Sequence, residues 1–158
     1  MVNEAEIKKA KQIYNSLCSF LDENHLVYDR DDENLCTDFG FKGDDVPIHL
    51  IMKISPDSQF ITLCSFLPFE MDINMPVENA LAVCFVNNIL LQGNFDLDMS
   101  DGSIYFRLVT SFIDSLIDKS VFHNMIQTAL NTVETYNDQF DSLRKKEITL
   151  AEFIKKNK

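Results

Sequence analysis

Glycine is scarce in this chain, which has only four glycines in 158 residues. None of them lies in a GxGxxG or P-loop arrangement, so no loop of these kinds is available to hold the phosphates of a nucleotide. Histidine is also rare, and His25, His49 and His123 have no companions at the short spacings that zinc ligands need. We therefore expect no metal, no cofactor and no catalytic constellation.

Cysteine occurs four times but never as a CxxC pair. Each cysteine lies far from the others and inside an apolar pattern, which is typical of buried free thiols rather than of a disulfide framework. These residues are Cys18, Cys36, Cys64 and Cys84.

Positive charge is in the minority, with 14 Lys and Arg against 25 Asp and Glu and a net charge of -11. Binding to nucleic acid phosphates needs clustered positive charge, so this balance argues against a nucleic-acid partner. No apolar run approaches the length that spans a bilayer, and the first residues, MVNEAEIKKAK, are charged rather than signal-like. We expect a cytoplasmic protein that binds neither nucleic acid nor membrane.

Three long segments carry apolar residues at helical spacing. The first and the last are amphipathic, whereas the middle one is apolar around most of its circumference, which predicts a helix buried on most sides. Pro76 suits the first position of that middle helix, and Gly93 suits the residue that closes it. The segments are residues 4–23, 76–92 and 118–146.

Six shorter segments have the pattern of strands, and all but the fourth alternate apolar and polar residues as half-buried strands do. Asp101-Gly102 favours a tight turn between the last two, so that pair is predicted to form a β-hairpin. The segments are residues 26–29, 35–41, 47–54, 59–67, 94–99 and 104–109.

The order of the elements is α-ββββ-α-ββ-α-α. Runs of strands interrupted by helices indicate an α+β fold, with an antiparallel sheet on which the helices pack. We predict a single domain over residues 1–158, with a core of about residues 5–146. Thr149 and Glu152 have the spacing of a capping box, which predicts a short C-terminal helix over residues 149–157.

The strand predicted at residues 59–67 is apolar on both faces. Phe60, Cys64 and Phe66 line one face, and the other face carries Ile61, Leu63 and Leu67. Such a strand is either covered twice or keeps one face for another chain. We expect Ile61, Leu63 and Leu67 to contact a partner.

Three polar residues stand out near the apolar middle helix. Asn87 and Asn88 lie within it and Arg107 lies on the following hairpin. A buried asparagine usually satisfies a nearby backbone group, but these three residues are also candidates for contact with a ligand or a partner.

The run FVNNILLQGNFDLDMSDGSIYFRLVTSF resembles the YbjN family, whose members carry an apolar helix with asparagine, a glycine, an F-x-L-D strand, a D-G turn and a strand with arginine. That family is similar in fold to class I type III secretion chaperones, which are small, acidic and usually dimeric. The resemblance supplies no catalytic residues, and YbjN members are described as sensory-transduction regulators.

These observations lead to one main expectation and one alternative. The main expectation is a non-enzymatic, chaperone-like or regulatory module that forms a homodimer and holds a protein or peptide partner on an apolar surface. The alternative is a small-molecule or nucleotide sensor with a pocket between the middle helix and the sheet, lined by Asn87, Asn88 and Arg107.

Overall fold

The computed structural model describes residues 3–115 and 117–157. Over these residues the chain forms an α+β fold of four helices and six strands, which confirms the predicted fold class. The elements are α1 (Glu4–Glu23), β1 (Tyr28–Asp31), β2 (Cys36–Lys42), β3 (Pro47–Ser55), β4 (Phe60–Glu70), α2 (Pro76–Ile89), β5 (Asn94–Leu97), β6 (Ser103–Ser111), α3 (Lys119–Arg144) and α4 (Leu150–Lys156).

The six strands form one antiparallel sheet in the order β1-β2-β3-β4-β6-β5. The hairpin predicted around Asp101-Gly102 is present, and Gly102 adopts a positive φ of 84° in its turn. Strand β5 is much shorter than β6 and pairs with it only from Asn94, opposite Arg107, to Leu97, opposite Ile104.

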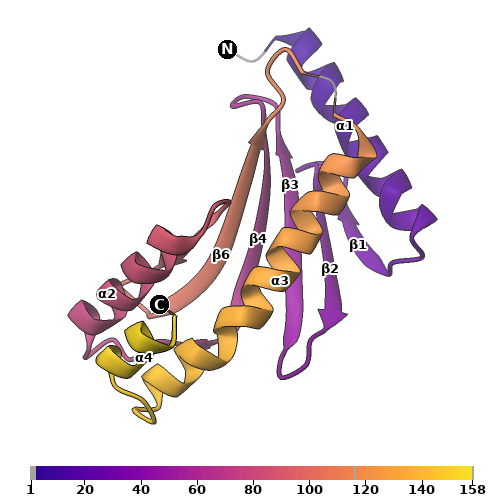
Figure 1. Cartoon of the computed structure of the whole chain (residues 1–158). Helices are drawn as coiled ribbons and strands as arrows, with labels where there is room; N and C mark the ends of the chain where they lie inside the picture. The colour runs from indigo at the N-terminus through magenta and orange to yellow at the C-terminus, as the bar shows by residue number, and fades with distance from the viewer. Residues whose placement is uncertain (1–2, 116, 158) are drawn as a thin grey trace.

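Helices α1 and α3 cover one face of this sheet, and Figure 1 shows α3 lying across the strands. The core lies between them, and the strand residues that point toward the helices are almost all buried. Leu50 and Met52 on β3 and Phe106 on β6 are completely buried, as is Phe122 on α3. None of the helices formed by residues 3–115 and 117–157 is long and apolar enough to cross a bilayer.

Helix α2 differs from the sequence-based expectation, which placed it in the core. It packs against β5 and α4 at one end of the sheet, so only one side of it is covered. Val83 and Val86 are buried, but Val77 is 69% exposed and Leu81 is 51% exposed. An apolar composition alone does not show on how many sides a helix is packed.

The end of α2 was also predicted too late. The helix stops at Ile89, and Leu90 is already extended, with φ -65° and ψ 133°. Gly93 does adopt a positive φ of 72°, but it serves the entry into β5 rather than the helix end. A side chain at Gly93 would overlap the ring of Phe106, so the glycine lets the chain pass close to β6.

Candidate functional site

The three predicted partner contacts on β4 lie in the core. Ile61 and Leu63 are completely buried and Leu67 is 6% exposed, because their face of the strand is the one that α1 and α3 cover. A partner cannot reach them while the helices are in place. The opposite face of β4 carries Phe60, Cys64 and Phe66.

No helix of the described chain packs on that opposite face, which we call the open face of the sheet. The strand register places Cys64 between Ile51 of β3 and Arg107 of β6. Phe66 lies beside Tyr105, and their ring centroids are 4.7 Å apart. Exposed apolar side chains occur here on two adjacent strands, where Phe60 is 38%, Phe66 46% and Val109 43% exposed.

Two pairs of polar or charged side chains flank these apolar side chains. Arg107 Nε lies 2.8 Å from an Asp96 carboxylate oxygen, on the β5 side of the patch. On the β2 side, His49 Nε2 lies 2.9 Å from an Asp38 carboxylate oxygen. Burial raises the pKa of the Tyr105 phenol. The open face thus has an apolar centre and a rim of polar and charged side chains.

A hollow of about 460 Å³ extends this surface toward the β5–β6 hairpin. Phe66 of β4 lines it together with Asp96 and Met99, which precede the hairpin turn, and Tyr105 and Arg107, which follow it. Aromatic rings beside an Arg–Asp pair can bind an apolar side chain together with the polar backbone that carries it.

Asn87 and Asn88 have different environments. The side chain of Asn87 accepts a hydrogen bond from the Phe95 backbone N–H (2.8 Å) and donates one to the Phe95 carbonyl (2.9 Å). It therefore ties α2 to β5 by satisfying backbone groups. Asn88 is exposed on α2, and Arg107 lies on the open face of the sheet. The three residues do not converge on a pocket between the helix and the sheet.

We predict that Asn87→Ala lowers the free energy of unfolding by about 1–3 kcal/mol, because it leaves the N–H and the carbonyl of buried Phe95 without their partner. Asn88→Ala is the matched control, and we expect it to change stability by less than about 0.5 kcal/mol. Urea denaturation of both variants measures this difference. Equal effects would show that the Asn87 contacts do not stabilise the fold.

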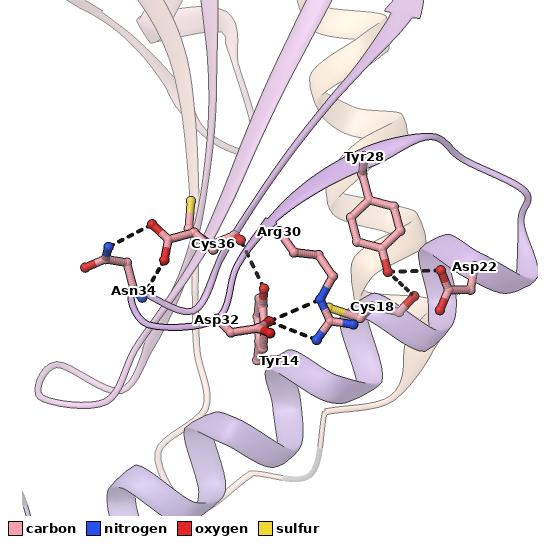
Figure 2. A network of polar contacts seen from close by, with 9 residues as sticks. Tyr14, Cys18, Asp22, Tyr28, Arg30, Asp32, Asn34 and Cys36 are labelled. Atoms are coloured by element: carbon pink, nitrogen blue, oxygen red, sulfur yellow. Dashed lines mark hydrogen bonds and ion pairs between the residues drawn. The ribbon is translucent and has the colours of Figure 1, made fainter.

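A second cluster of titratable groups lies where α1 meets the β1–β2 hairpin (Figure 2). The Tyr14 hydroxyl donates to the Cys36 carbonyl (3.2 Å), and the Tyr28 hydroxyl contacts the Asp22 carboxylate (3.0 Å). Burial raises the pKa of Cys18 and raises that of Tyr28 to about 12. A neutral, buried thiol is a poor nucleophile, so this cluster anchors the helix to the hairpin.

Candidate ligands for a metal do not gather anywhere in residues 3–115 and 117–157, where no group of three or more His, Cys, Asp or Glu side chains could hold an ion. All four cysteines are free, and Cys84 on α2 is the exposed one. The sequence-based reading of buried thiols therefore holds for Cys18 but is wrong for Cys84. Cys36 and Cys64 are half-buried.

The sequence pattern showed that β4 is apolar on both faces, but the three residues predicted to contact a partner, Ile61, Leu63 and Leu67, lie on the face that is buried. Phe60, Cys64 and Phe66 were visible as one apolar line, and their exposure depends on where α1 and α3 pack. The sequence did not show that Val109 belongs to this exposed apolar surface. Val109 lies beside the β4 residues only because β6 pairs with β4, and that pairing is not visible in the sequence.

Comparison with known proteins establishes the fold. No protein-family model and no curated protein matches this sequence. YbjN from E. coli, described as a candidate transcription regulator, has 12% identity and a TM-score of 0.59 over 79% of this chain and 91% of YbjN. The crystal structure of the ExsC–ExsE complex contains a chain with 13% identity and a TM-score of 0.60 over 80% of this chain and 92% of that one.

The HopA1–SchA chaperone–effector complex also contains a similar chain, with 13% identity and a TM-score of 0.59 over 83% of this chain and 97% of that one. At these identities the likeness concerns the fold. The resemblance to YbjN and to type III secretion chaperones that the sequence suggested is thus confirmed as a shared fold.

Proposed function

We propose that this protein is a non-enzymatic binding module of the cytoplasm, which holds a protein or peptide partner on the open face of its sheet. The observation that carries this proposal is the exposure of Phe60, Phe66 and Val109 on a face that no helix of the described chain covers. Apolar side chains exposed to water lack the stabilisation that burial gives, and a partner that covered them would supply it.

The arrangement of the open face supports a polypeptide partner. Protein interfaces have an apolar centre enriched in aromatic residues and a polar rim, and the ring pair Phe66–Tyr105 lies between the rim pairs Arg107–Asp96 and His49–Asp38. Two of the structures that share this fold are complexes, one of them a chaperone with its effector. Four free cysteines agree with a reducing compartment.

Co-purification from the cells in which the protein is made tests this proposal. We expect at least one polypeptide to be enriched with the natural chain and to fall by tenfold or more with Phe66→Asp, since a carboxylate at the apolar centre would be desolvated by the partner. Ile7→Asp is the matched control, because Ile7 is 39% exposed but lies on α1. Equal recovery with Phe66→Asp and Ile7→Asp would contradict the proposal.

We further propose that the protein forms a homodimer through α2. Val77, Leu81 and Cys84 follow one another at helical spacing on the uncovered side of this helix, and Leu91 beyond its end is fully exposed. An isologous dimer brings the same patch of two copies together, so one apolar stripe is enough to build it. This surface is separate from the open face of the sheet.

A further inference from the structure

Strand β6 has an unpaired edge over its second half. Asn94, the first residue of β5, lies opposite Arg107, and before it the chain turns away at Gly93 toward α2. Strand β4 continues to pair with the other side of β6 as far as Ser111. From Leu108 to Ser111, β6 therefore has a neighbour on one side only.

The direction of the backbone groups follows from two hydrogen bonds at the ends of β6. On the β4 side, the N–H of Phe112 donates to the Gln59 carbonyl (2.9 Å). On the β5 side, the carbonyl of Ser103 accepts from the Asp98 N–H (2.8 Å). Because these directions alternate along a strand, the N–H and carbonyl groups of Val109 and Ser111 point to the unpaired edge. No backbone partner for them occurs among the described residues.

A groove of about 530 Å³ runs beside this edge, between β6 and the first turns of α3. Its walls include the apolar side chains of Leu108, Val121 and Met125 and the polar side chains of Gln92 and Asn124. None of the lining side chains is charged. The groove therefore suits an apolar side chain, and a charged one would find no partner of opposite sign.

The other edges of the sheet are protected in the ways that usually prevent strand addition. Strand β1 carries Asp29, Arg30 and Asp31. Strand β5 carries Asp96. The free part of β6 has the sequence Leu-Val-Thr-Ser, without charge or proline, and its pairing with β4 is regular there. An unprotected edge of this kind is a template for another strand.

From these observations we propose that an extended segment of the partner polypeptide adds to β6 as a short strand beside Val109 and Ser111, in line with β5. The backbone of the added segment hydrogen-bonds to the N–H and carbonyl groups of these two residues. Side chains of the segment point alternately to the two faces of the sheet, and an apolar one on the helix-covered face enters the groove against Val121 and Met125. This inference rests on the proposed function only in taking the partner to be a polypeptide. Val109 belongs to both surfaces, because its side chain lies on the open face and its backbone N–H and carbonyl point to the edge.

The test uses ten-residue peptides, displayed on phage and selected against the whole immobilised protein, with the best binder then made synthetically. Val109→Pro removes one N–H that points to the edge and leaves the bonds to β4 intact. We expect it to raise the Kd of the peptide at least tenfold in fluorescence anisotropy. Val109→Ala is the matched control, because it removes the same open-face side chain but keeps the N–H, and we expect it to raise the Kd less than threefold.

Methylation of single backbone nitrogens in the peptide provides a readout that needs no variant protein. We expect binding to be lost at alternate positions, because only every second N–H of an added strand faces β6. An unchanged Kd with folded Val109→Pro, a methylation pattern without alternation, or a selection that yields no binder would overturn the edge proposal. Loss of binding with Phe66→Asp alone would overturn it too, while leaving the open-face function standing.

Discussion

Leu63→Ala is expected to lower the free energy of unfolding by about 2–5 kcal/mol, as deletion of a fully buried leucine does when the cavity cannot collapse. Leu63 is completely buried on β4, with Met52 and Leu108 as its neighbours on the adjacent strands. Phe66 lies three residues further along the same strand and points to the open face. Although Phe66→Ala removes a larger side chain, we expect it to cost about 1 kcal/mol, mainly from the lost contact with Tyr105.

Chemical denaturation of the two variants measures both changes in the free energy of unfolding. We expect the two variants to have the same m value, which is the slope of that free energy against denaturant concentration. The comparison distinguishes the faces of one strand without knowledge of any partner. If Phe66→Ala were as costly as Leu63→Ala, the open face would be covered in solution, either by another copy of the chain or by a different arrangement of the helices.

Leu81→Asp is expected to convert a homodimer into a monomer. Leu81 is 51% exposed and lies in the middle of the uncovered side of α2, so the substitution would place two carboxylates close together in an isologous interface. Loss of a central apolar anchor costs about 2 kcal/mol or more, which corresponds to a dimer Kd raised roughly thirtyfold or more. Light scattering coupled to size exclusion measures the change of mass.

The control for this variant is Val27→Asp, because Val27 is 91% exposed but lies between α1 and β1, away from α2. Cys84 provides a second readout, since it lies on the same side of α2 as Leu81 and is the exposed cysteine of the described chain. Mild oxidation should cross-link the natural chain through Cys84 and should leave Cys84→Ser uncross-linked. A natural chain that is monomeric at micromolar concentration would contradict the dimer proposal.

Much of the fold could be predicted from the sequence because local patterns specify local structure. Helix α1 has the predicted bounds, Glu4–Glu23, since its apolar positions recur at helical spacing and Asn3 caps it. The capping box of Thr149 and Glu152 is present at the start of α4. On β3, Ile48, Leu50, Met52 and Ile54 face the core as their alternation indicated.

The candidate site was harder to predict, because it depends on contacts between elements that are distant in the sequence. The sequence of β4 shows that both faces of this strand are apolar, but only the packing of α1 and α3 decides which face is covered. For the same reason α2 was expected in the core, whereas it packs at the end of the sheet. The unpaired edge of β6 follows from the length of β5 and the turn at Gly93, and no residue pattern in β6 itself reveals it.

Hydroxyl-radical footprinting of the complex recovered by co-purification tests whether the partner polypeptide binds to the open face of the sheet. We expect oxidation of Phe60 and Phe66, measured by mass spectrometry, to fall severalfold when the partner is bound, while oxidation of Ile7 on α1, which has similar exposure, does not change. Unchanged oxidation of Phe60 and Phe66 in the complex, or protection confined to the outer sides of α1 and α3, would show that the partner binds elsewhere.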